Sequence, residues 1–120
     1  MSKLATNAMI DGGLDEMSTC TLLTVCAGQP TNYADIAARK LASVVIDGSD
    51  FTKADGDSSG RKVTISQQAS ISITASGNAD HVVIDDGSAD YVVTTATSQA
   101  LTSGGTVTVP AWDIEISDPT

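Results

Sequence analysis

The only histidine of this 120-residue chain, His81, lies in the acidic segment NADHVVIDDGSADYVV at residues 78–93. Imidazole and carboxylate groups together can bind a metal ion or act as general acid and base. His81 and Asp85 are four residues apart, however, and on one strand about 13 Å separates them, too far to bind one ion. The segment DDGSAD also has the Gly and Asp residues of a turn. The sequence therefore favours a β-hairpin over a metal or catalytic site, although four carboxylates surround the histidine: Asp80, Asp85, Asp86 and Asp90.

A second candidate site is the segment DGDSSG, in which Asp55, Asp57 and Ser59 occupy the first, third and fifth positions of a calcium-binding loop. The twelfth position of such a loop is a bidentate Glu, and here it is Ser66. The flanking segments alternate as strands do and lack the pattern of helices. We therefore expect a polar turn between strands that binds calcium weakly at best.

Enzyme chemistry is not indicated by any motif of the chain. A serine or cysteine nucleophile needs a neighbouring base, and the sequence has no G-x-S-x-G segment and a single histidine. Cys20 and Cys26 are six positions apart, too far on one strand for a disulfide, so we expect two buried, reduced thiols. We expect a protein that is not an enzyme, with no catalytic, cofactor-binding or metal-binding residues and no cofactor.

The charge of the chain is unevenly distributed. The net charge is −9, and residues 1–62 hold all six Lys and Arg, whereas residues 63–120 hold seven acids and no base. An acidic surface repels phosphate backbones, so we expect no nucleic-acid partner. No run approaches the roughly 20 apolar residues that span a bilayer, and the N-terminus lacks the apolar core of a signal peptide. We expect no membrane partner and synthesis in the cytoplasm.

Strand-forming patterns dominate the chain. Ser and Thr make up 29 of the 120 residues and alternate with Val and Ile in several stretches, as in half-buried strands. Helical spacing is limited to residues 4–17, where two glycines interrupt it, and to residues 32–41, where Asn32 is the expected N-cap. We expect an N-terminal arm or short helix at residues 1–17. A single mainly β domain should follow at residues 18–120, an antiparallel β-sandwich or small β-barrel of about seven strands with one short helix near residues 32–41.

The last apolar stretch changes its alternation at Pro110. Val107 and Val109 share one parity, and Trp112 and Ile114 share the other. Proline cannot donate a hydrogen bond to a strand ladder, and a bulge that inserts one residue would turn both apolar sets to the same face. The sequence therefore predicts a bulge or a sheet edge at this proline.

Five segments carry a resemblance that covers nearly the whole chain: LATNAMIDGGLDEM, VCAGQPTNYADIA, SDFTKADGDSSGRKVTI, SGNADHVVIDDGSADYVVTT and QALTSGGTVTVPAWDIEISDPT. These turn-and-strand patterns resemble small virion proteins of long-tailed bacteriophages, in particular capsid decoration, or cement, proteins. The resemblance implies a non-enzymatic structural protein, made in the host cytoplasm, that binds the major capsid protein on the outer surface of the assembled head. It further implies that the protein bridges capsomers and forms a homo-oligomer, with a trimer favoured.

Under this hypothesis an N-terminal arm that cannot bury its own apolar side chains docks on the capsid. Removal of the arm would then leave the domain folded. Trp112 is expected either in the core or as an anchor between subunits. The expected partner contacts are Leu4, Met9, Ile10, Leu14 and Trp112.

Two alternatives remain open at this point. The first is a tail or fibre module that recognises a host surface glycan, in which Tyr91 beside the acidic hairpin supplies the aromatic ring that sugar sites use. The second is a structural protein that calcium stabilises through the DGDSSG segment.

Overall fold

The structure is a computed structural model that describes residues 6–88 and 90–116. Its helices are α1 (Asn7–Met17), α2 (Tyr33–Arg39) and a single 3-10 turn at Gly48–Asp50. The strands of the described residues are, in chain order, β1 (Leu22–Cys26), β2 (Lys40–Val45), β3 (Phe51–Asp55), β4 (Arg61–Ile65), β5 (Gln68–Ser72), β6 (Gly77–Asp85), β7 (Tyr91–Leu101), β8 (Thr106–Val109) and β9 (Trp112–Ile116). None of the helices in these ranges is long and apolar enough to cross a membrane.

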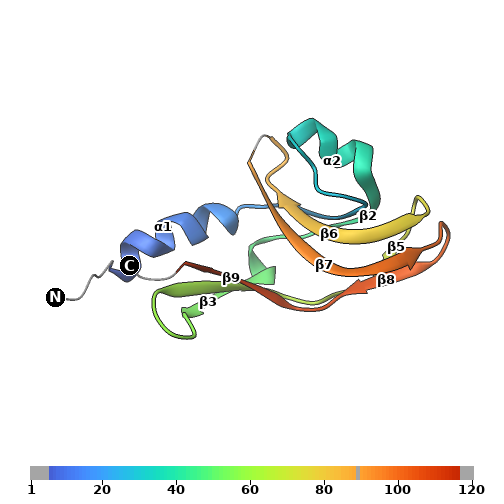
Figure 1. The fold of residues 1–120 in the computed structure, drawn as a ribbon. Helices are drawn as coiled ribbons and strands as arrows, with labels where there is room; N and C mark the ends of the chain where they lie inside the picture. Colours follow the sequence, from blue (N-terminus) through green and yellow to red (C-terminus); the bar gives the residue numbers. More distant parts are fainter. Residues whose placement is uncertain (1–5, 89, 117–120) are drawn as a thin grey trace.

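The strands form three antiparallel sheets, in the orders β2-β1-β6-β7, β3-β4-β9 and β5-β8 (Figure 1). The expected mainly β, antiparallel fold with a short helix near residues 32–41 is confirmed. The sheets do not close into a barrel. We call the four-stranded sheet, the β5-β8 pair and α2 the main sandwich, and we call α1 with β3, β4 and β9 the distal unit.

Asn32 caps α2 as the sequence predicts. Its side-chain oxygen accepts a hydrogen bond from the backbone N–H of Asp35 at 2.9 Å, which satisfies one free donor of the first helical turn. Asp35 also pairs with Arg39 one turn later, at 2.7 Å. Ile36 faces inward and, with Cys26 and Val83, forms a small second core between α2 and the four-stranded sheet.

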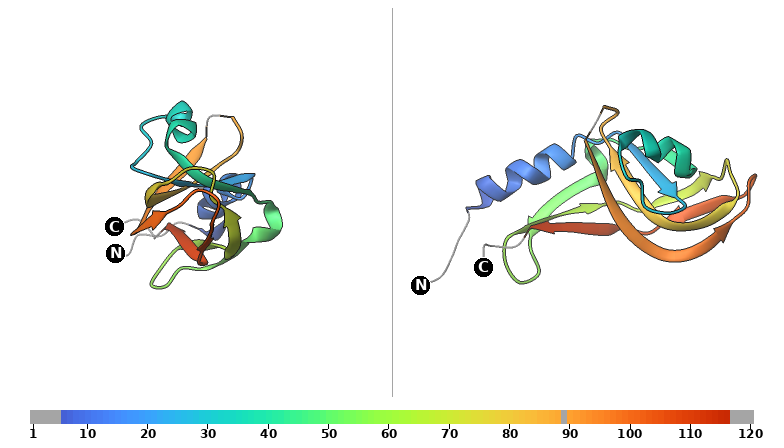
Figure 2. Two further views of the ribbon diagram at one scale, coloured as in Figure 1. Left: turned by 90° about the vertical axis from the view of Figure 1, so that its right-hand side faces the viewer. Right: turned by 45° about the horizontal axis from the view of Figure 1, so that its top comes forward.

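A long antiparallel ribbon connects the distal unit to the main sandwich (Figures 1 and 2). One strand of the ribbon is β4 followed by β5, and the other is β8 followed by β9. Ile65 pairs with Trp112 and Gln68 pairs with Val109, so the register is the same on both sides of Pro110. The strand breaks at Pro110 without the insertion of a residue there.

The apolar side chains before and after this break face the same core, as the sequence predicts. Val109 is buried, and Trp112 packs against the same apolar core from the other side of the break. The register shift itself lies on the opposite strand, between Gln68 and Ile71. Ser70 in that interval has a φ of 56°, in the left-handed region, as in a bulge.

The main core lies between the four-stranded sheet and the β5-β8 pair, and it continues beneath α1. Its most deeply buried side chains come from both parts of the molecule: Leu14, Leu23, Val63, Ile65 and Ile84. One apolar cluster therefore spans the main sandwich and the distal unit.

Helix α1 packs on its own chain, contrary to the expectation of an arm that cannot bury its apolar residues. Ile10 is 5% exposed and Leu14 is fully buried. Asp11 forms an ion pair with Arg61 of β4 at 3.0 Å, and Asp15 pairs with Lys53 of β3. The helical spacing of Ile10 and Leu14 gives α1 an apolar side that covers the three-stranded sheet, so the two glycines do not prevent the helix.

The main sandwich is joined on one side and open on the other. On the joined side Ala42 of β2 bridges to Ile73, and the backbone N–H groups of Thr74 and Ala75 donate to the carbonyl of Leu41. On the opposite side, β7 pairs only with β6, β8 only with β5 and β9 only with β4 among the described residues. We call this unpaired side, between β7 and the β8–β9 strand, the open seam.

The molecule is elongated. Its principal extents are 54 × 25 × 24 Å, and its radius of gyration of 15.3 Å exceeds the roughly 14 Å of a compact domain of this length. Figure 2 shows the cause, since the distal unit projects from one end of the main sandwich.

Candidate functional site

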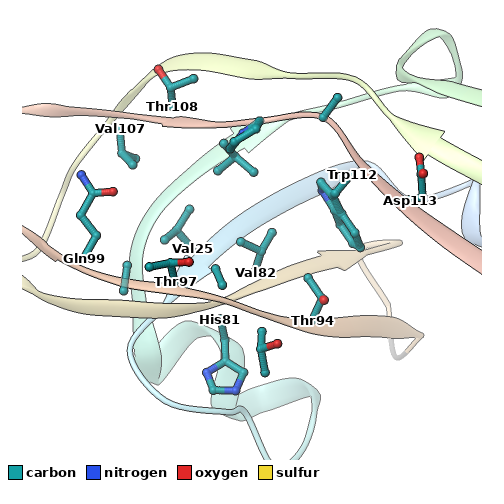
Figure 3. A pocket seen from close by; sticks show the side chains of 16 residues that line it. Val25, His81, Val82, Thr94, Thr97, Gln99, Val107, Thr108, Trp112 and Asp113 are labelled. Atoms are coloured by element: carbon teal, nitrogen blue, oxygen red, sulfur yellow. The ribbon is translucent and has the colours of Figure 1, made fainter.

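The open seam contains the larger of two recesses described here, a groove of about 530 Å³ (Figure 3). Its apolar wall is formed by side chains from both layers of the sandwich: Val25, Val82, Val107, Val109 and Trp112. Thr94, Thr97 and Gln99 of β7 give its rim a polar character. The groove is therefore a part of the sandwich core that reaches the surface because β7 and β8 do not pair.

Trp112 lies at one end of this groove and is partly buried. It packs against the main core, which is one of its two expected roles, the other being an anchor between subunits. Its indole N–H is buried without a hydrogen-bond partner among the described residues. A buried donor without an acceptor is destabilising, so a surface that covers the groove and supplies an acceptor would stabilise this side chain.

His81 borders the groove, but its imidazole ring points toward the opposite face of the sheet (Figure 3). Its Nδ1 lies 2.8 Å from Oδ1 of Asp80, and the same oxygen accepts a hydrogen bond from the backbone N–H of Gly28 at 2.7 Å. The hydrogen bond with His81, and secondarily that from Gly28, lowers the pKa of Asp80. This pair ties β6 to the loop after β1.

The acidic hairpin is confirmed, with β6 and β7 joined by a turn. Asp85 and Asp86 accept hydrogen bonds at 2.9 Å from the backbone N–H groups of Gly87 and Ser88, two residues further on in each case. Such bonds are the reason that Asp favours turns. The carboxylates at this end of β6 are not brought together with His81, so the structure assembles no histidine–carboxylate metal site from these residues.

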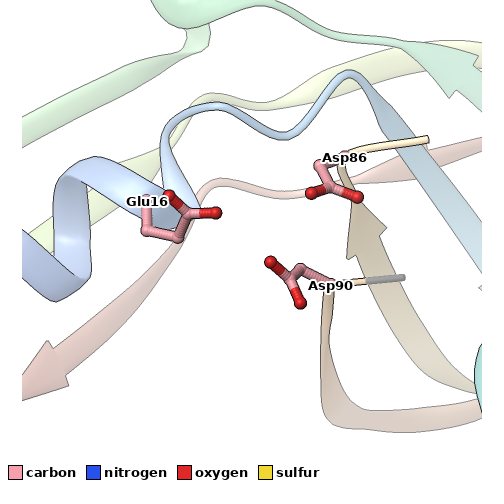
Figure 4. Close-up of side chains that lie close together, drawn as sticks. All are labelled: Glu16, Asp86 and Asp90. Carbon is pink, nitrogen blue, oxygen red and sulfur yellow. The ribbon is translucent and has the colours of Figure 1, made fainter. Parts of the chain in front are cut away.

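A cluster that the sequence does not predict lies beside this turn, where Glu16 of α1 meets Asp86 and Asp90 (Figure 4). Carboxylate oxygens of the three residues lie within 4.8 Å of one another. Three such oxygens are fewer than the six to eight that calcium takes. Glu16 is 70 residues away from Asp86 in the sequence, so no local spacing could have indicated this meeting.

Cys20 lies next to that cluster in a second recess of about 370 Å³, and it is a buried thiol. Burial, with a contribution from the charges of Asp86 and Asp85, raises its pKa to about 11. Burial likewise raises the pKa of Cys26 to about 11. The raised pKa values favour the protonated form of both thiols at neutral pH, whereas a nucleophilic cysteine needs a thiolate.

The DGDSSG segment forms the turn between β3 and β4, as expected. Asp55 pairs with Arg61 at 2.7 Å and Asp57 pairs with Lys62 at 2.8 Å. The backbone N–H of Asp57 also donates to the carboxylate of Glu115. The two Asp carboxylates therefore have lysine and arginine partners within the chain, and the calcium-loop geometry is not assembled around them.

The expected partner contacts have different environments. Met9 is 78% exposed and can contact a partner, whereas Ile10 and Leu14 are buried in the chain's own core. Leu4 lies outside the described residues. Tyr91 is partly buried and packs against the small core beneath α2.

Comparisons with models of protein families, with curated proteins and with solved structures found no match. Function is therefore inferred from the residues and the geometry of this chain. The prominent feature of this geometry is the open seam.

Proposed function

We propose that this protein is a non-enzymatic structural protein of a phage virion, which binds the major capsid protein on the outside of the assembled head and stabilises it by bridging capsomers. The sequence resemblance supports the virion assignment. The observation that carries the proposal is the open seam, where a free sheet edge and an apolar groove lie together. Such surfaces recognise proteins by strand addition and by covering apolar side chains.

The elongated shape supports a bridging role. A molecule of 54 Å along its longest axis with two structurally different ends can contact two neighbouring subunits at once. Met9 near one end offers an exposed apolar side chain, and burial of a methionine of this kind stabilises a contact.

The test is co-sedimentation of the purified protein with emptied, expanded phage capsids. We expect saturable binding at a fixed ratio to the capsid protein. Met9→Glu should weaken binding, and Val45→Glu should leave it unchanged. The two residues make a matched pair because they are 78% and 77% exposed, so neither substitution disturbs the core.

Absence of saturable binding by the unmodified chain would overturn the decoration proposal. If Met9→Glu and Val45→Glu both bind as well as the unmodified chain, the contact lies away from Met9. In that case the decoration role is retained and only the role of α1 is wrong.

The second candidate function is a tail or fibre module that recognises a host surface glycan. The groove favours it through its combination of Trp112 with Thr94, Thr97 and Gln99, since an aromatic ring and hydroxyl or amide groups are what sugar sites use. Binding to a glycan array that Gln99→Ala abolishes would support this function. An array without hits would exclude it for the glycans tested.

A further inference from the structure

The free edge of β7 has a defined set of backbone groups. The backbone N–H of Asp86 donates to the carbonyl of Asp90, which makes these two a hydrogen-bonded pair in the β6–β7 ladder. In an antiparallel ladder hydrogen-bonded and non-hydrogen-bonded pairs alternate. Val92 and Thr94 therefore bond to β6, and the backbone N–H and C=O groups of three residues point away from β6: Tyr91, Val93 and Thr95.

These outward groups have no strand partner among the described residues, and no charge protects the edge. Residues 91–112 form the longest run of the sequence without a charged residue, 22 positions between Asp90 and Asp113. Exposed edges commonly carry lysine or another charge that prevents pairing with a second chain. The first half of β7 lacks that protection.

A bulge limits the edge that can pair. On β6 only Asp80 lies between Ala79 and His81, but on β7 three residues lie between their partners Gln99 and Thr95. The extra residues bend β7 and divide it. The straight part that can accept another strand is the five-residue segment Tyr91–Thr95.

Because the whole chain is acidic, only an uncharged strand edge is suited to pair with the same edge of a second copy. Each copy carries a net charge of −9, and a two-fold contact brings the same short segment of both copies together, with the residue on the axis facing its own counterpart. An edge with acids would therefore place like charges opposite one another, which is destabilising. The Tyr91–Thr95 edge avoids this, and its β-branched and aromatic residues are already ordered as a strand.

We propose that two copies of this chain associate through antiparallel pairing of Tyr91–Thr95 with the same segment of the other copy, about a two-fold axis at Val93. This register sets Val93 opposite Val93 and Tyr91 opposite Thr95. It uses all the outward groups, with two reciprocal hydrogen bonds in each pair. The four-stranded sheets of the two copies become continuous through their β7 edges. The β8–β9 side of the open seam takes no part in these hydrogen bonds, and the proposed capsid contact uses that side.

An isologous contact of this kind closes at two copies. The predicted species is therefore a dimer, whereas the resemblance favours a trimer. The contact does not depend on the capsid, so it can be tested without any other component.

The first measurement is sedimentation velocity of the full chain over about 1 to 100 μM, a range in which a small interface becomes populated. We expect a monomer–dimer equilibrium. Thr95→Pro removes an outward N–H that β6 does not use, and it should weaken association at least about tenfold. Thr97→Pro is the matched control, because Thr97 is an exposed residue of the same strand in the bulge and outside the pairing segment.

A second variant keeps the test decisive if Thr95→Pro fails to fold. Cα atoms of a hydrogen-bonded pair are about 5.5 Å apart, within the range that a disulfide spans. Val93→Cys should therefore form a disulfide-linked dimer under mild oxidation, and Thr97→Cys should not.

Dimers that Thr95→Pro weakens and that Val93→Cys cross-links would support the contact. A chain that stays monomeric throughout, or dimers that neither variant affects, would overturn it. A monomer that still binds capsids would separate the two proposals, because the decoration role would then stand without this contact.

Discussion

Cys20 and Cys26 differ from reactive cysteines in the direction of their pKa shift. A reactive thiol has a lowered pKa and is partly exposed, beside a positive charge or a helix N-terminus. Here burial raises the pKa of both thiols from the ordinary 9.0 to about 11, and for Cys20 the charges of Asp86 and Asp85 add to the effect. At the residue scale these side chains contribute to packing, and they link the stability of the fold to alkaline pH.

Stability should fall between pH 9 and pH 11. The pKa of each thiol is higher in the folded chain, so its stabilising contribution is complete below pH 9 and is lost as the unfolded chain ionises first. At pH 10 the loss should be about 1 kcal/mol for each thiol. Urea unfolding at pH 8 and pH 10 under reducing conditions measures it. The double variant Cys20→Ala/Cys26→Ala should lose correspondingly less stability between the two pH values, and an equal loss would contradict the assignment.

The Glu16, Asp86 and Asp90 cluster should be a site of charge repulsion. Its three carboxylates have oxygens within 4.8 Å of one another, so Glu16→Gln should stabilise the fold by up to about 0.5 kcal/mol at low salt. The gain should vanish at 1 M salt, where the screening length is about 3 Å. Thermal unfolding at both salt concentrations measures the effect.

The control for this substitution is Asp55→Asn, which removes a carboxylate that faces Arg61 and should not stabilise the fold. Stabilisation of the unmodified chain by calcium, abolished by Glu16→Gln, would contradict repulsion as the sole role of the cluster.

At the element scale, α1 is held by its buried side. Leu14 is fully buried, so Leu14→Ala should lower the free energy of unfolding by about 2 to 5 kcal/mol through loss of apolar contact and a cavity. Met9→Ala on the exposed side of the same helix should change it by no more than about 0.5 kcal/mol. Urea unfolding of both variants checks this. A small effect of Leu14→Ala would restore the view of α1 as an arm.

Local patterns of the sequence predict the elements well. The N-cap at Asn32, the turn at DGDSSG, the acidic hairpin and the sheet edge at Pro110 all appear in the structure, because each depends on residues within a few positions of one another. The bulge that was the alternative at Pro110 lies on the opposite strand instead. What local patterns do not predict is which elements meet. The burial of Ile10 and Leu14, the meeting of Glu16 with Asp86 and the open seam all depend on long-range strand order, for which the sequence has no local signal.

At the scale of the whole molecule, the distal unit and the main sandwich share one apolar cluster but differ in how well they are covered. Strands β1 and β6 are central in the four-stranded sheet and have side chains buried on both faces. Strand β3 is an edge strand with mostly exposed side chains. Native-state hydrogen exchange should therefore be slowest in β1 and β6 and fastest in β3 and α1.

Native-state hydrogen exchange of the Leu14→Ala variant should show different losses of protection in the distal unit and in the main sandwich. Loss of this side chain uncovers the three-stranded sheet, so protection should fall most in α1, β3, β4 and β9, and least in β1 and β6. Protection should then decrease along the ribbon of β4–β5 and β8–β9, from the more stable main sandwich to the less stable distal unit. An equal fall of protection in all strands would mean that the 54 Å molecule opens as one cooperative unit, in which case α1 stabilises the seam as much as the sheet it covers.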